Sequence, residues 1–461
     1  MARPCPPRCI NLTKVPFRFG RYGRAIGISG LINKVYCGQS PGVLTRADRS
    51  TSLPGNGRPP MADSDAPGRR RALGLVSLAV LLASATWFSG TAAAPALRDL
   101  WDLSEIQASW LTVAVQLGFI AGTFVYALLN VADVFPPRRV FFFSALAGGV
   151  FNAGFAFFAE GAETALALRF LTGVTLAGVY PVGMKIVAQW HRSGLGLGLG
   201  ILVAALTLGT ALPYLISSFG RMADWRLGSA AASLFAVVGG SIAAFAVSDG
   251  PYFRERARFD VRAAFRLFRH RPFRLQALGY FGHMGELYAL WSLGGFFAAA
   301  GFSERRPPAP ENVSLLMFFV VGAGAVGCVL GGSFSRRVGE KVVALAALVV
   351  SGICALSSGF VSPLPPAFLV AFMLVWGAAA VADSAQFSSL AVQTCPPEYA
   401  GTALTIQNGI GFAVTVAAIP LAAGLGQAVG WRWAFTALAA GPFLGGLALS
   451  RLKRTDIRRS D

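Results

Sequence analysis

Three ionisable side chains that could carry protons lie inside long apolar stretches of this 461-residue chain, namely His283, Glu286 and Asp383. His283 and Glu286 are three residues apart, which places them on one face of a helix. An acid held away from water takes up a proton more readily than one in solution, so it can bind and release a proton during a working cycle. We therefore interpret Glu286 and Asp383 as proton-coupling residues, with His283 modulating their charge.

A fourth ionisable side chain, Arg169, also lies within an apolar stretch. A charged group in the membrane interior costs about 2.5–3.5 kcal/mol on insertion scales unless it is paired or hydrated. Arg169 therefore either faces a central cavity or extends to the nearby membrane surface. In the cavity it would bind a small polar or anionic solute, with aromatic support from Tyr180 or Trp291 and hydrogen bonding from Gln386. The structural alternative is a fixed pair that locks helices together, for example Arg169 with Glu286.

The sequence lacks the motifs of several other protein classes. It has three histidines, no HExxH pattern and no Gly-Lys dipeptide, so it predicts neither a zinc hydrolase nor a Walker A nucleotide loop. Its six cysteines form no CxxC motif and are interpreted as reduced thiols. The net charge of +19 comes from the N-terminal segment and the ends of the apolar stretches, which does not favour nucleic-acid binding. We expect no enzymatic activity, cofactor, metal, nucleotide or nucleic-acid partner.

The composition points to a membrane protein. Hydrophobic residues make up 54% of the chain and charged residues 13%, whereas soluble domains have about 25% charged residues. The apolar stretches lack the two-residue alternation of barrel strands, so we expect transmembrane helices. The twelve predicted spans are 72–97, 106–132, 140–159, 164–190, 193–220, 227–247, 275–302, 312–335, 342–362, 366–394, 400–429 and 433–450.

The second half of these spans repeats the first. Trp225, followed by arginine, recurs 206 residues later as Trp431, and Pro213 recurs 207 residues later as Pro420. In many carriers, two duplicated halves form a central site between them, and this site opens alternately to either side of the membrane. The fold class predicted is all-α, with twelve transmembrane helices in two pseudo-symmetric six-helix bundles. The predicted parts are a basic, disordered extension at 1–70, bundles at 72–247 and 275–450, a basic cytoplasmic linker at 248–274 and a cytoplasmic tail at 451–461.

Lysine and arginine gather in alternate loops, which predicts that both termini face the cytoplasm of the inner (plasma) membrane of a bacterium. The linker carries eight arginines interleaved with apolar residues, as in an amphipathic helix lying on an anionic lipid surface. A regulatory partner for this linker is the alternative. For the extension, an organellar transit peptide and an upstream reading frame that precedes a start at Met61 are both open.

The loop from Leu129 to Arg139 resembles the conserved cytoplasmic loop of the major facilitator superfamily, in which glycine, aspartate and basic residues hold two helices together. Leu129 replaces the usual glycine here, whereas the copy after span eight keeps Gly332 and Gly339 but has arginine for the aspartate. We interpret these loop residues as a clasp of charge-assisted hydrogen bonds at helix ends. The alternative is that the basic residues only anchor the loop on the cytoplasmic side of the membrane. The clasp residues predicted are Asp133, Arg138, Arg139, Arg336 and Arg337.

Span four also resembles this superfamily, because Arg169 is followed four residues later by Gly173. The resemblance covers about residues 72–450 and implies that spans one, four, seven and ten line a cavity, with Arg169 facing it. It implies a secondary transporter of a small-molecule solute by alternating access, which we expect to be coupled to protons. The alternatives are an uncoupled facilitator and a transporter-like membrane sensor.

Overall fold

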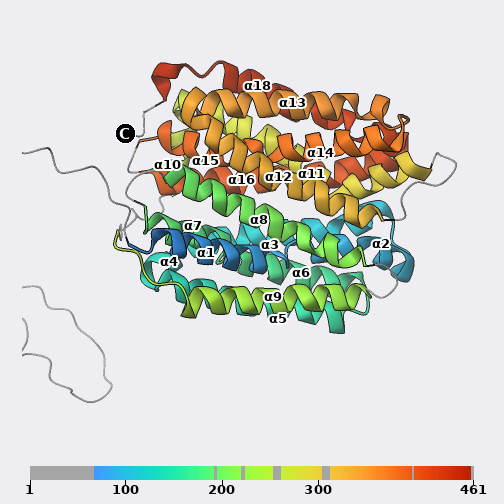
Figure 1. Ribbon diagram of the computed structural model, residues 1–461, viewed down its shortest axis with the longest axis horizontal. Coiled ribbons are helices and arrows are strands. Elements are labelled where there is room, and N and C mark those ends of the chain that lie inside the picture. Colours follow the sequence, from blue (N-terminus) through green and yellow to red (C-terminus); the bar gives the residue numbers. More distant parts are fainter. Residues whose placement is uncertain are drawn as a thin grey trace, which may run out of the picture. The chain divides into compact units, whose positions relative to one another are not determined.

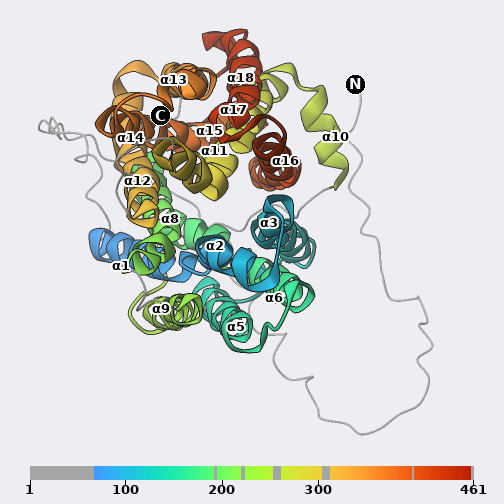
Figure 2. The same cartoon turned by 90° about the vertical axis from the view of Figure 1, so that its right-hand side faces the viewer.

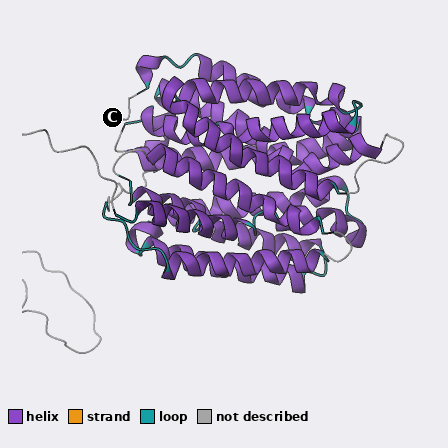
Figure 3. Ribbon diagram, viewed as in Figure 1, coloured by secondary structure: helices purple, strands orange, loops and turns teal. Residues whose placement is uncertain are grey.

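The computed structural model describes residues 67–191, 195–219, 224–252, 261–303, 312–396 and 399–457. Most of the extension predicted at 1–70 therefore lies outside the described residues, as do the last four residues of the tail. Across the described ranges the regular elements are all helical (Figure 3). The helices lie within one compact unit, Asp63–Asp461.

Eighteen α-helices and two short 3-10 helices form the described structure (Figure 1). Those of the first half are α1 (Arg69–Ser84), α2 (Ser89–Trp101), α3 (Glu105–Leu128), α4 (Val131–Val134), α5 (Pro137–Phe158), α6 (Ala162–Leu176), α7 (Tyr180–Ala188), α8 (Leu195–Ser217) and α9 (Trp225–Phe245). Those of the second half are α10 (Val261–Arg269), α11 (Arg271–Ser303), α12 (Val313–Val338), α13 (Glu340–Val361), α14 (Pro366–Ala382), α15 (Ser384–Gln393), α16 (Ala400–Val429), α17 (Trp431–Ala434), η3 (Thr436–Ala439), α18 (Ala440–Ser450) and η4 (Arg454–Asp456).

Eleven helical segments of the described chain are long and apolar enough to cross a membrane. They correspond to all the predicted spans except the seventh. That span is α11, which at 33 residues is also long enough but has a lower hydropathy than the others. The prediction of an all-helical membrane protein with twelve spans is confirmed.

Three predicted spans are broken near their middle. Span one is interrupted between Ser84 and Ser89, span four between Leu176 and Tyr180, and span ten at Asp383. The sequence predicts continuous helices there, because the residues at the breaks are mostly apolar. Non-helical backbone at membrane depth requires other donors and acceptors, so it is found where it is buried in protein or lines a cavity.

The two halves of the chain form two groups of helices, α1–α9 and α11–α18 (Figures 1 and 2). Both groups use the same close contact. A Cβ atom at Gly173 in α6 would lie 2.1 Å from the carbonyl oxygen of Val115 in α3, and one at Gly377 in α14 would lie 2.1 Å from that of Val320 in α12. Gly377 follows Gly173 by 204 residues, close to the spacing of the tryptophan repeat. The duplication seen in the sequence is therefore repeated in the packing of its helices.

The groups meet along two pairs of neighbouring helices, α3 with α16 and α8 with α12 (Figure 2). At the membrane end that holds α2, polar contacts also join the halves. Trp431 Nε1 donates to Glu105 Oε1 at 3.1 Å, and Asn312 Nδ2 donates to the carbonyl of Ser218. Phe296 stacks on Trp431 with ring centroids 5.1 Å apart. The two hydrogen bonds therefore join the halves at this end, and the ring stack holds Trp431 in place within the second half.

The linker helix α10 packs on protein as well as carrying arginines. Leu267 is buried in a cluster with Phe273 and Ala403, and Arg266 lies over the ring of Tyr399. Phe265 points outward and is 75% exposed. The amphipathic character expected of the linker is present in the described part of α10, but part of its apolar face contacts α11 and α16.

Candidate functional site

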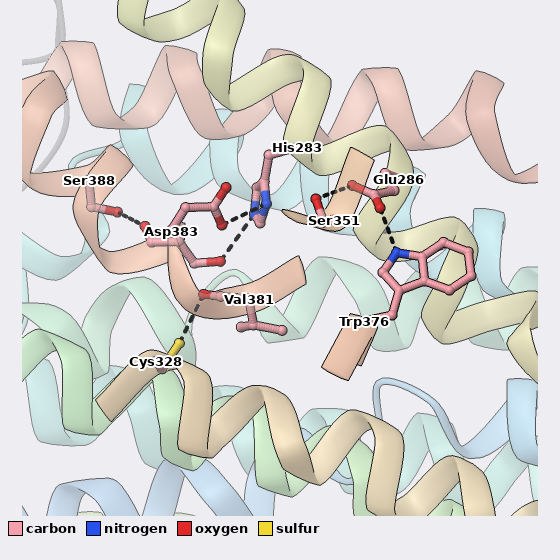
Figure 4. Close-up of polar contacts among 9 residues, drawn as sticks. His283, Glu286, Cys328, Ser351, Trp376, Val381, Asp383 and Ser388 are labelled. Carbon is pink, nitrogen blue, oxygen red and sulfur yellow. Dashed lines mark hydrogen bonds and ion pairs between the residues drawn. The ribbon is translucent and has the colours of Figure 1, made fainter. Parts of the chain in front are cut away.

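The break in span ten places an acid against a histidine of span seven (Figure 4). Asp383 occupies the junction between α14 and α15, and its Oδ1 lies 2.9 Å from Nδ1 of His283 in α11. The other ring nitrogen, Nε2, lies 3.1 Å from the hydroxyl of Ser384. His283 and Asp383 are both buried, at 2% and 1% exposed. The two titratable groups therefore lie within ion-pair distance of each other and are enclosed by protein.

Glu286 lies one turn further along α11 and has neutral partners. Its Oε1 accepts a hydrogen bond from Trp376 Nε1 at 2.6 Å, and its Oε2 accepts one from the Ser351 hydroxyl at 2.8 Å. Those donors come from α14 and α13, so one carboxyl group joins three helices. The Ser351 hydroxyl can both donate and accept, so this arrangement accommodates the carboxylate and the protonated acid.

Arg169 is fully buried in α6 and binds the break in span one. Its Nη1 donates to the carbonyl of Thr86 at 2.8 Å, to Ser89 Oγ at 2.9 Å and to Asn152 Oδ1 at 2.8 Å. Its Nη2 donates to the carbonyl of Trp87. The guanidinium thus satisfies backbone oxygens that the break leaves outside the helical pattern. Arg169 is enclosed by protein, and its hydrogen-bond partners in the described structure are these oxygens and not Glu286.

Its Nε atom, by contrast, is buried with no hydrogen-bond partner among the described residues. Gly90 packs directly against this edge, since a Cβ atom there would lie 2.7 Å from Nε. The predicted role of Arg169 in binding a solute stays a prediction. Its contacts indicate that it also positions the backbone of span one.

The other predicted solute-binding residues lie on three elements. Tyr180 is half-buried at the start of α7, directly after the break in span four. Gln386 is buried in α15, and its amide nitrogen has no hydrogen-bond partner among the described residues. Trp291 is buried in α11, and its indole nitrogen likewise has no partner there. Buried donors are usually hydrogen-bonded, so these two groups are free to bind water or a solute.

Trp291 belongs to a cluster of aromatic rings that joins the two halves. Its ring centroid lies 5.8 Å from that of Phe88, and Trp87 lies 5.6 Å from Phe412. Tyr288 contacts rings from both sides. Trp87 and Phe88 belong to the broken segment of span one, whose backbone Arg169 binds. The arginine network and the interface between the halves are therefore adjacent.

The predicted clasp residues have different surroundings. Arg138 Nη2 lies 3.2 Å from Asp249 Oδ2, which ties the start of α5 to the segment after α9. Arg139 lines a surface pocket. Arg336 and Arg337 are exposed at the end of α12. The side chain of Asp133 lies outside the described residues.

In the second half, a lysine joins helix ends instead. Lys341 Nζ donates to the carbonyls of Ser450 and Leu452, which ties the start of α13 to the end of α18. Lys341 is a basic residue of the second loop copy, but it is not among the predicted clasp residues.

Sequence reasoning did not single out Asn152, Trp376 or Ser351. Asn152 is fully buried in α5 and connects Arg169 to α9, because its Nδ2 donates to the carbonyl of Ser229 and to Ser233 Oγ. An amide in the middle of an apolar stretch was the available signal for Asn152. For Trp376 and Ser351 no signal distinguishes them from other residues of the same types in a membrane helix.

Comparison with known proteins gives two matches. The sequence profile described as Major Facilitator Superfamily matches residues 76–418 and, in a second alignment, 308–460. A relative from Bacillus subtilis, the putative niacin/nicotinamide transporter NiaP, is 31% identical over 94 residues. That alignment covers 20% of this chain and 23% of the relative. The chain therefore matches less than a quarter of the length of this relative.

Proposed function

Because the chain belongs to the Major Facilitator Superfamily, whose profile matches most of its length, we propose that it is a secondary active transporter of a small polar or anionic solute. The bundles at 72–247 and 275–450 rock about a central site, which is exposed alternately on each side of the membrane. Movement of the solute is coupled to protons through Asp383, Glu286 and His283.

The observation that carries this proposal is the pairing of His283 with Asp383 at 2.9 Å, inside the membrane span and at the break in span ten. Buried acids within a membrane span mark proton paths in pumps and transporters. A break in a helix is also where transporters commonly form their sites. In our proposal, protonation of Asp383 weakens its contact with His283 and so alters how α11 and α15 are held together.

The solute class follows from the surroundings of Arg169 and from the relative. Arg169 brings positive charge into the interior of the first half, and buried aromatic rings lie beside the segment of span one that it binds. The name of the relative mentions niacin and nicotinamide, one an anion and the other its uncharged amide. We propose these two compounds as the first solutes to test, because their difference in charge reports on the role of Arg169.

The test is uptake into proteoliposomes that contain the purified full-length protein. A thermal-shift screen of small polar and anionic solutes selects the solute for the flux assay. An imposed inward proton gradient is expected to drive accumulation above the equilibrium level. Uptake that ignores the gradient would refute coupling and identify an uncoupled facilitator. Binding without any flux would favour a sensor.

Variants locate the coupling within the protein. Asp383→Asn and Glu286→Gln are each expected to abolish accumulation above equilibrium, because the amides cannot exchange a proton. Glu163→Gln is the matched control, since Glu163 is an exposed acid at the start of α6. If the two amide variants accumulate solute as the control does, these acids do not couple transport to protons.

We further propose that the protein lies in a bacterial inner membrane with both termini in the cytoplasm. The basic loops support this topology, since Arg138, Arg139, Arg336 and Arg337 lie at helix ends between spans two and three and between spans eight and nine. On that side the ion pair between Arg138 and Asp249 acts as the clasp that holds one conformation. Labelling of single cysteines in these loops with a membrane-impermeant reagent tests the topology.

A further inference from the structure

A pocket of about 370 Å³ is lined by residues from the end of α3, from α4 and from the start of α5. The helices α4 and α10 lie at the same end of the molecule (Figure 1). None of the lining residues belongs to the proton-coupling residues or to the arginine network. The residues that line it are Tyr126, Val131, Phe135, Pro136, Arg139, Val140, Phe143 and Ser144.

The lining is apolar except for one charge and one pair of hydroxyl groups. The Tyr126 hydroxyl and Ser144 Oγ are 2.8 Å apart and bind each other, so they are satisfied within the pocket wall. The remaining polar residue among the described lining residues is Arg139. In the described part of the chain the pocket therefore combines an apolar surface with one basic residue.

The two neighbouring arginines differ in their partners. Arg138 forms an ion pair with Asp249 at 3.2 Å, whereas Arg139 has no ion-pair partner in the described part of the chain. Around the pocket, apolar side chains point outward, with Phe135 57% and Phe143 63% exposed. In a membrane protein such side chains at a helix end contact lipid.

We propose that this pocket binds one anionic phospholipid, with its phosphate at Arg139 and an acyl chain against Phe135 and Phe143. The charge of the pocket is complementary to an anionic headgroup, and basic pockets at helix ends are known to bind such lipids. The apolar lining distinguishes a lipid from a free anion, because inorganic phosphate would leave the aromatic surface uncovered. The proposal goes beyond the transport function and does not depend on the solute or on proton coupling.

Native mass spectrometry of the delipidated full-length protein tests this proposal. The protein is titrated with phosphatidylglycerol, with phosphatidylcholine as the uncharged-headgroup comparison and with glycerol phosphate as the headgroup alone. One phosphatidylglycerol is expected to bind more tightly than phosphatidylcholine. Arg139→Gln is expected to weaken phosphatidylglycerol binding about five-fold, in line with one arginine near a membrane surface. The matched control is Arg451→Gln, because Arg451 is exposed after α18, and it is expected to bind as the unmodified protein does.

A second variant tests the cavity itself. Val131→Trp fills the pocket without removing charge, and it is expected to lose the tightly bound lipid while keeping its unfolding temperature. Equal binding by Arg139→Gln and Arg451→Gln would overturn the proposal. So would retention of the lipid by Val131→Trp, or binding of glycerol phosphate that is as tight as that of phosphatidylglycerol.

Discussion

Arg169 and Glu286 are both fully buried, and the protein stabilises them with different kinds of partner. Arg169 donates to oxygen atoms of the backbone and of two polar side chains. Glu286 accepts from an indole and a hydroxyl group. The first arrangement requires the planar, multiply donating guanidinium, whereas the second tolerates a change in protonation. This difference favours a positioning role for the arginine and a titrating role for the acid.

Replacing Arg169 by lysine tests the positioning role. The ammonium group of lysine has fewer donors than a guanidinium, and they are not spread in a plane, so it cannot bind all four acceptors. Each buried group left without a hydrogen bond costs about 1–3 kcal/mol. We expect a clear fall in the unfolding temperature of the purified protein. Arg226→Lys is the control, because Arg226 lies over the ring of Trp225 near the start of α9. An unfolding temperature equal to that of the control would show that the charge alone is sufficient.

A double-mutant cycle measures the contact between Glu286 and Trp376. Trp376→Phe removes the indole donor, and Glu286→Leu removes the carboxyl acceptor. Hydrogen bonds to charged groups contribute about 1.5–3 kcal/mol, so we expect a coupling free energy of at least about 1 kcal/mol. The free energy of unfolding in mixed micelles gives this value. Trp376→Phe combined with Glu163→Gln should be additive, and additivity in the first pair would mean that the contact contributes nothing.

The charged residues of the candidate site were the easiest to single out in the sequence. Arg169, Glu286 and Asp383 stand out because a charge in an apolar stretch is costly. Asn152 and Trp376 are neutral, and their importance depends on partners brought close by the fold. The side chains at the breaks are mostly apolar, so the sequence did not indicate that Arg169 would bind the backbone carbonyls of Thr86 and Trp87.

At the scale of elements, close packing of helices depends on glycines that the duplication repeats. Gly173 allows α6 to touch α3, and Gly377 allows α14 to touch α12, each at a distance that excludes a side chain. Glycine at such positions lets the backbones of neighbouring membrane helices approach closely. The same requirement in both halves explains why glycine occurs at corresponding positions of the two copies.

Gly173→Ala and Gly377→Ala are each expected to destabilise the protein by about 1–3 kcal/mol, because the added methyl group overlaps a backbone oxygen. Gly74→Ala is the matched control. Gly74 lies in α1 with nothing within 4 Å of an added Cβ atom, so alanine there should be neutral or slightly stabilising. Unfolding temperatures of the three variants decide the matter. Equal temperatures would show that these helices separate without penalty.

The positions of the helices were predictable because lipid leaves little choice of structure for a long apolar stretch. The breaks in spans one, four and ten were not, since a break depends on partners from other helices. Asp383 illustrates the point. Its acid group was visible in the sequence, but its place at the junction of α14 and α15 depends on the packing of α11 beside it.

At the scale of the whole molecule, the two halves are held together at the end that contains α2. Trp431 donates to Glu105 across the halves and stacks on Phe296. The repeat-related Trp225 instead contacts Trp101 and Phe155 within its own half. The two tryptophans of the repeated motif therefore make different contacts. Trp431 joins the two halves, whereas Trp225 packs inside the first half.

Trp431→Phe is expected to open this end more often, because the hydrogen bond to Glu105 is lost. Spin labels at the exposed positions Leu100 and Val429, in a protein without its native cysteines, would report a larger population of long distances. Trp225→Phe is the matched control and should leave the distance distribution unchanged. The prediction fails if both variants give the same distribution as the parent.

The breaks in three spans have a mechanical consequence. Spans one, four and ten each consist of two short helices joined by a non-helical segment, whereas α11 is a single helix of 33 residues. An unbroken helix moves as one rigid body, but the two helices of a broken span can tilt separately. In the transporter that we propose, one end could therefore open while the other stays closed.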